Sequence, residues 1–127
     1  MFASPEEKRR AQDERASDKA ALLEALSRAG LVPVTSAADA GASVAWSPAL
    51  ATAVHCYLAR SQSKLLLVQL DDLAAEELQA NLPGSTSGYP SWRRRLRRAI
   101  EELSADPQIL EEIAAIASAR ANPSAAM

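Results

Sequence analysis

The chain has 127 residues, of which 48% are apolar and only 4% aromatic, so it can bury one small core built on aliphatic side chains. Its formal net charge of −2 excludes a global field strong enough to steer nucleic acid or an anionic membrane to it. The single cysteine, Cys56, excludes an intrachain disulfide, and no run approaches the roughly 20 apolar residues of a membrane span.

The first predicted element is a charged and amphipathic helix over residues 4–31. Ser4 can accept a hydrogen bond at its N-terminus, and Pro5 suits its first turn. The second half carries leucines on one face, and Gly30 is a typical residue for the end of a helix. Residues 31–45 are rich in Pro, Gly, Ser, Thr and Asp, so we expect a loop there.

A second helix is predicted to start at Ser47 and Pro48 and to end near Arg60. Residues 64–70, Lys-Leu-Leu-Leu-Val-Gln-Leu, are short and almost continuously apolar, which is typical of a strand buried on both faces of a parallel sheet. A short helix is expected to follow, as far as Gln79. Because a lone strand leaves its backbone unpaired, this pattern indicates neighbouring strands that the chain does not contain.

The last third of the chain is predicted to hold a loop and two helices. The loop, residues 81–91, contains two prolines and two glycines. Ser91 can cap a helix with one apolar stripe, and Asp106 can cap the final helix before a frayed tail. The stripe consists of Trp92, Leu96, Ile100 and Leu103. We therefore expect a mainly α chain of about five helices and one short strand.

One segment carries a family resemblance. Asn81-Leu-Pro-Gly-Ser-Thr-Ser-Gly-Tyr-Pro-Ser-Trp-Arg-Arg-Arg-Leu96 resembles the Asn-x-Pro-Gly-Thr…Pro-Asn-Trp-Arg-x-Arg motif of 4-α-glucanotransferases. The segment from Ala53 to Arg60 is similar to the Val-His-x-Tyr-Leu-Ala helix of that family, and the segment from Lys64 to Leu73 to its last barrel strand. The segments follow in the same order, and a weaker match begins near Asp18, so the resemblance covers roughly residues 15–105.

This resemblance implies a truncated (β/α)₈ barrel. Residues 1–127 would form a single partial domain. Within it, residues 4–31 would be a flanking helix, and residues 47–105 the last βα unit with its neighbouring helices. Residues 106–127 would be a terminal helix and tail. The expected partners are an α-1,4-glucan or maltooligosaccharide and the missing N-terminal part of the barrel.

The resemblance also implies a substrate-binding loop at the rim of the barrel. Asn81 would contact the glucan, and Pro83 and Gly84 would hold the loop close to the sugar. Tyr89 is the aromatic residue we expect to face the sugar. Trp92 could stack on a sugar ring, but packing in the core is the preferred interpretation. Structural roles are expected for Trp92, Arg93 and Arg95.

No catalytic residue is expected. A retaining transferase needs two carboxyl groups about 5–5.5 Å apart. The family's Asp-x-Phe-Arg motif has no counterpart, because the only phenylalanine is Phe2. Its His-Asp motif is absent too, because Cys56 follows the only histidine, His55, and no Glu-Leu-Gly motif is present. We therefore expect the chain alone to be inactive, with no cofactor and no metal, and His55 to be a packed or half-exposed side chain.

Two alternatives of another class remain. The first is a stand-alone helical module that binds a protein partner through its apolar strand. The second is a nucleic-acid binder that uses the arginines of residues 93–98 to contact phosphates. Nucleic acid is the less favoured partner, because Arg97 and Arg98 can pair with Glu101 and Glu102 at helical spacing, and the rest of the chain is acidic on balance. The pairs Glu76-Glu77 and Glu101-Glu102 are interpreted as solvated helix faces. No membrane partner is expected, and the absence of a signal peptide predicts a cytoplasmic protein.

Overall fold

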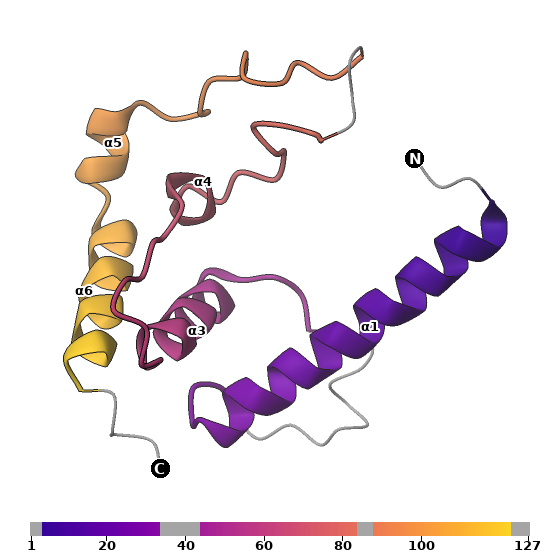
Figure 1. Cartoon of the computed structure of the whole chain (residues 1–127). Coiled ribbons are helices and arrows are strands. Elements are labelled where there is room, and N and C mark those ends of the chain that lie inside the picture. The colour runs from indigo at the N-terminus through magenta and orange to yellow at the C-terminus, as the bar shows by residue number, and fades with distance from the viewer. Residues whose placement is uncertain (1–3, 34–43, 84–87, 123–127) are drawn as a thin grey trace.

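The computed structural model describes residues 4–33, 44–83 and 88–122. These residues form five helices and no strand, which confirms the mainly α prediction for this part of the chain. The helices are α1 (Pro5–Arg28), α3 (Pro48–Ala59), α4 (Leu70–Leu73), α5 (Ile100–Ser104) and α6 (Pro107–Ala121) (Figure 1). None of the helices in the described ranges is long and apolar enough to cross a membrane.

Three helices begin where the sequence predicts, at a capping side chain followed by a proline. Ser4 and Ser47 each accept a hydrogen bond at 3.2 Å from the backbone N–H of the residue three positions further on. Asp106 accepts one at 2.8 Å from the N–H of Gln108. Each bond satisfies a donor that the first helical turn leaves unpaired. Proline lacks an N–H, but an N–H at this position would have no partner within the helix.

Helix α1 ends at Gly30, as predicted. The N–H of Leu31 donates to the carbonyl of Leu26 and that of Gly30 to the carbonyl of Ser27, each at 3.0 Å. This pair of bonds requires a left-handed residue, and Gly30 has φ +67°. Only the C-terminal half of α1 packs, through the buried Leu23 and Leu26, whereas its N-terminal half extends away from the other helices (Figure 1).

The core lies where α3 crosses α6. Cys56 and Ala59 of α3 pack against Ile116 of α6. This burial raises the pKa of the Cys56 thiol. Arg120, in the last turn of α6, reaches the end of α3. Its guanidinium donates to the carbonyl of Ala59 at 3.2 Å and also to the carbonyls of Ser61 and Ser63. The two helices are therefore joined by apolar contact and by hydrogen bonds from this guanidinium to carbonyls that have no partner at and after the end of α3.

The predicted strand over residues 64–70 is not formed. The backbone of residues 64–68 makes no hydrogen bond to any other described residue, and α4 begins at Leu70. Side chains still alternate: Leu66 and Val68 pack against the core, whereas Leu65 and Leu67 are 81% and 89% exposed. The physical reason is that a strand needs neighbouring strands to pair with its backbone, as the sequence pattern already indicated.

The helix predicted from Ser91 is also shorter than expected. It begins only at Ile100, and the predicted helix to Gln79 is limited to the single turn of α4. Trp92 has φ +60° and is 79% exposed, so it does not pack in the described core as the stripe predicts. The polar groups of the residues before Ile100 instead form hydrogen bonds and ion pairs with residues that are distant in the sequence. Those contacts compete with the formation of a local helix.

Candidate functional site

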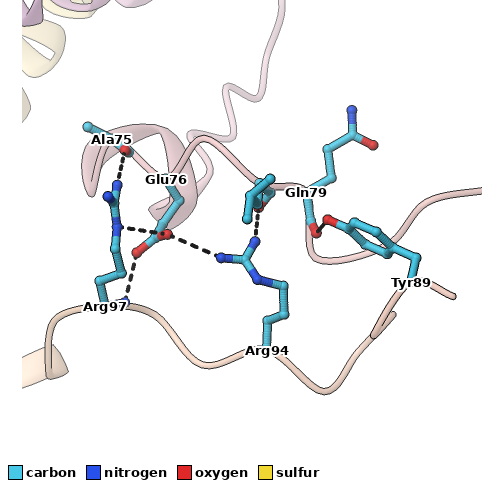
Figure 2. A network of polar contacts seen from close by, with 7 residues as sticks. Ala75, Glu76, Gln79, Tyr89, Arg94 and Arg97 are labelled. Carbon is cyan, nitrogen blue, oxygen red and sulfur yellow. Dashed lines mark hydrogen bonds and ion pairs between the residues drawn. The ribbon is translucent and has the colours of Figure 1, made fainter.

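Two irregular segments flank the loop that the sequence singles out. We call residues 75–83 the first arm and residues 88–97 the second arm, and they run side by side (Figure 2). The N–H of Trp92 donates to the carbonyl of Ala80 at 2.8 Å, and the hydroxyl of Tyr89 donates to the carbonyl of Gln79. The two arms are thus linked by direct hydrogen bonds although neither is a helix or a strand.

Arginine side chains from the second arm supply further links. Arg94 donates from its guanidinium to the carbonyl of Leu78 at 2.6 Å, and Arg97 donates to the carbonyl of Ala75 at 2.7 Å (Figure 2). Because these donors are charged, each bond is stronger than one between neutral groups. The guanidinium groups thus donate hydrogen bonds to first-arm carbonyls, which have no neighbouring strand to pair with.

The carboxylate of Glu76 lies between the two arginines. One oxygen, Oε1, accepts from the backbone N–H of Arg97 at 2.8 Å. The other, Oε2, lies 3.3 Å from Nε of Arg97 and 3.8 Å from a terminal nitrogen of Arg94. The side chain of Glu76 is only 5% exposed. Its pKa is lowered, first by the hydrogen bond from the Arg97 backbone and then by the positive charges of both arginines.

A second ion pair connects the end of the second arm to α6. The guanidinium of Arg98 lies 2.7 Å from Oδ2 of Asp106, the residue that caps α6. This hydrogen bond is the main reason why the pKa of Asp106 is lowered, with the capping bond from Gln108 adding to it. The predicted pairing of Arg97 and Arg98 with Glu101 and Glu102 at helical spacing is therefore replaced by pairing with residues outside the helix.

The structure places the predicted substrate residues in different surroundings. Asn81 is half-buried on the first arm, and its side-chain amide makes no hydrogen bond to another described residue. Pro83 is exposed, and Gly84 lies outside the described residues. Tyr89 is half-buried, with its hydroxyl on the first arm. The arms therefore bring Tyr89 next to Gln79, two residues before Asn81.

The side chains of the three residues expected to be structural face outwards. Trp92, Arg93 and Arg95 are all exposed, and neither Arg93 nor Arg95 forms an ion pair with another described residue. Arg94 and Arg97, between and beyond them, make the contacts that join the arms. Three of the five arginines of this run therefore pair within the chain, which leaves two for phosphates.

Sequence reasoning missed Glu76, which it interpreted as part of a solvated helix face. No local signal was available, because its partners lie 18 and 21 residues further along the chain. A longer-range signal does exist: an acidic pair, Glu76 and Glu77, precedes the loop, and the arginine run follows it. Opposite charges on the two sides of a loop favour a structure that closes it.

The ionisation of Glu76 bears on what this site can do chemically. Glu76 is surrounded by donors and its pKa is lowered, so it is a poor group for exchanging protons near neutral pH. Within the described ranges, no group of three or more His, Cys, Asp or Glu side chains is arranged to hold a metal ion. What the arms present is an amide, peptide groups and an aromatic ring, which suit a polar ligand with flat apolar faces.

Comparison with known proteins gives one consistent family. The family model described as 4-alpha-glucanotransferase matches residues 7–101. The chain is 39% identical over 88 residues to the 4-alpha-glucanotransferase of Haemophilus influenzae, a match that covers 69% of this chain and 12% of that protein. It is 33% identical over 97 residues to the 4-alpha-glucanotransferase of Mycobacterium bovis, which covers 76% of this chain and 12% of the relative.

The same identity and coverage are found with the 4-alpha-glucanotransferase of Mycobacterium tuberculosis. No solved structure matches the chain significantly. The chain thus spans about an eighth of the length of these relatives, 12% in each case.

Proposed function

Because the chain belongs to the 4-α-glucanotransferase family, we propose that it supplies a glucan-contacting loop to such an enzyme. Its described contact residues lie on the two arms, Asn81 on the first and Tyr89 on the second. The observation that carries this proposal is the set of hydrogen bonds between the arms, which holds Tyr89 on the carbonyl of Gln79 beside Asn81. A loop whose two sides are fixed loses less conformational entropy when it binds a ligand than a loop that must first be ordered.

Asn81 is the side chain proposed to touch the sugar. An asparagine amide offers both a donor and an acceptor, as a pair of sugar hydroxyls requires. The Asn81 amide makes no hydrogen bond to the other described residues, so these groups are available to a ligand. The ring of Tyr89 would cover an apolar face of the sugar, while Pro83 and Gly84 would keep the backbone close to it.

The complete reaction is proposed for the enzyme as a whole, in which an α-1,4-glucan segment passes to an acceptor through a covalent glycosyl-enzyme. The residues of this chain contribute binding to that reaction and no acid, base or nucleophile. We therefore propose that the chain by itself does not transfer glucan. Glucose release from maltotriose by the purified chain would contradict this part of the proposal.

Binding is the direct test of the proposed loop. We expect titration of the labelled chain with maltoheptaose to shift the amide signals of Asn81 and Tyr89, and cellohexaose, with β-1,4 linkages, to shift them less. Asn81→Ala should remove the binding. Asn122→Ala is the matched control, because Asn122 lies at the far end of α6 and bonds only within that helix end. Equal binding by both variants would overturn the assignment of Asn81.

A second function, binding of further chain, is favoured by residues 64–69. Leu65 and Leu67 are exposed, and the backbone beside them is unpaired among the described residues. An apolar groove of about 480 Å³ adjoins them. It is lined by Lys64, Leu65, Leu66, Val68, Leu73, Ile113, Ile116, Ala117 and Arg120.

We propose that the occupant of this surface is an extended apolar strand. Such a strand would satisfy the free backbone groups of residues 64–68 and cover Leu65 and Leu67 at once. The relatives contain about eight times the length of chain that matches here, so they have room for it. The strand would then belong to the remainder of the barrel, and residues 64–70 would become its last strand.

A further inference from the structure

We propose that Glu76 is the positioning residue of the glucan-contacting loop. It would act through Arg94 and Arg97, without touching the sugar itself. This inference rests on the proposed function, because it concerns the same loop. It assigns to Glu76 a role in recognition, although the residue lies outside the motif that carries the family resemblance.

The geometry gives Glu76 a central place. Its two oxygens receive three separate groups, which are the Arg97 backbone N–H, the Arg97 side chain and the Arg94 side chain. Both arginines then extend beyond the carboxylate to first-arm carbonyls, those of Ala75 and Leu78 (Figure 2). Five of the contacts between the arms therefore either end on the carboxylate or depend on an arginine that it holds.

Removal of the carboxylate would leave two guanidinium groups close together with no counter-charge. Like charges at that distance repel, so both arginines would be expected to turn towards water. The arms would keep three hydrogen bonds, from Trp92 to Ala80, from Tyr89 to Gln79 and from the N–H of Leu82 to the hydroxyl of Ser91. With no helix or strand in either arm, little else would fix the place of Asn81.

The turn before Glu76 supports a positioning role. Ala75 has φ +53°, a conformation that costs a non-glycine residue roughly 1–2 kcal/mol. The N–H of Glu76 donates to the carbonyl of Asp71 at 2.9 Å, which fixes the direction in which the side chain leaves the backbone. Strained backbone of this kind persists only where surrounding contacts determine it, and the contacts here are the backbone bonds to Asp71 and Asp72 together with the bond from Arg97 to the carbonyl of Ala75.

The test compares Glu76→Gln with Glu77→Gln. Both variants remove one negative charge from neighbouring residues, but Glu77 is exposed and makes no ion pair with another described residue. We expect Glu76→Gln to weaken maltoheptaose binding by roughly tenfold, because the binding-competent loop would be populated for only part of the time. Glu77→Gln should bind as the unmodified chain does.

Loop order is measured separately, without sugar. In Glu76→Gln the hydrogen exchange of the Trp92 amide should accelerate and its signal should move towards the position of an unstructured chain. Amides of α3 and α6 should not change, which shows that the fold is intact. If the variant unfolds instead, Arg94→Met is the second variant, because it keeps an unbranched apolar stem and removes only one of the two guanidinium groups.

The outcomes separate the two proposals. Glucan binding by Glu76→Gln equal to that of the unmodified chain would overturn the positioning role and leave the proposed function standing. Unchanged exchange at Trp92 would overturn it as well. Failure of the unmodified chain to bind maltoheptaose, together with a loosened loop in Glu76→Gln, would overturn the proposed function while showing that Glu76 orders the arms.

Discussion

Nδ1 of His55 lies 2.7 Å from Oε1 of Glu112, and this contact joins α3 to α6 inside the molecule. The two residues are 8% and 7% exposed, respectively. They are the polar members among buried residues of the described ranges that are otherwise alanine, leucine, isoleucine and Cys56. Because neither group has water to replace its partner, each depends on the other for its hydrogen bond.

Glu112→Ala should therefore destabilise the chain by about 3 kcal/mol, since it leaves the imidazole buried without a partner and opens a small cavity. Glu112→Gln should cost less, because an amide oxygen can still accept from the ring. Urea unfolding followed by circular dichroism measures both. Glu111→Ala, one residue away on the exposed side of α6, is the control and should change the free energy of unfolding by less than about 0.5 kcal/mol. Equal effects at the two positions would show that the buried pair contributes nothing.

Gly30→Ala tests the end of α1. An alanine at φ +67° costs roughly 1–2 kcal/mol, although nothing lies within 4 Å of the added Cβ, so the cost would come from the backbone alone. Gly30→Asn should cost less, because asparagine tolerates the left-handed region. Thermal unfolding of both variants measures the difference. The same melting temperature for the alanine and asparagine variants would contradict the backbone explanation.

Local signals predicted the parts of the fold that depend on local contacts. The caps at Ser4, Ser47 and Asp106 and the end of α1 at Gly30 each need only residues within one turn, so the sequence contains all the information. His55 is buried, which is one of the two states predicted for it, packed or half-exposed. Its partner was not found, although Glu112 lies between Ile109 and Ile116 at helical spacing on a buried stripe, where a carboxylate needs a partner.

The wrong predictions concern segments whose partners are distant or absent. The stripe from Trp92 to Leu103 has helical spacing, but Arg94 and Arg97 gain charged hydrogen bonds to the first arm only when the backbone leaves the helix. Residues 64–70 have a strand's composition, but the described residues offer no strand to pair with. For the candidate site, the sequence indicates Asn81 and Tyr89 through a motif, whereas Glu76 acts through contacts that no short motif records.

The ionisation of Glu76 predicts how the arms respond to acid. Its pKa in the folded chain is below its ordinary value of 4.5, so the folded arms bind this proton less tightly than the unfolded chain does. The stabilisation is therefore complete at neutral pH and is lost as the pH falls below 4.5 and through the folded pKa. The amide proton of Arg97, which donates to the carboxylate, should shift with a midpoint below 4.5.

Two variants check that this titration belongs to Glu76. Glu76→Gln should abolish the shift of the Arg97 amide. Asp71→Asn should preserve the shift. This substitution removes the other carboxylate that lines the same hollow between the arms, in which Arg94 and Arg95 supply the positive charges. A midpoint at or above 4.5 in the unmodified chain would contradict the contacts described for Glu76.

Replacing Leu65 and Leu67 together with lysine should abolish self-association. The exposed leucines lie on a segment, residues 64–68, whose backbone is unpaired among the described residues, and extended segments of this kind pair with one another when no other strand covers them. We therefore expect the sedimentation coefficient of the unmodified chain to rise with concentration and that of the double variant to stay monomeric. Leu22→Lys is the control, because Leu22 is 40% exposed on α1 and should leave the association unchanged.

The choice of positions matters for this experiment. The sequence alone does not distinguish Leu66 and Val68 from the exposed leucines of the same apolar run. Both pack against Cys56, Ala59 and Ile116, so lysine there would damage the core rather than the free surface. A loss of stability at Leu66 together with unchanged stability at Leu67 would confirm that the two faces of the segment differ. A chain that remains monomeric at every concentration would instead show that the open edge does not pair with a second copy, and would leave a strand of different sequence as its partner.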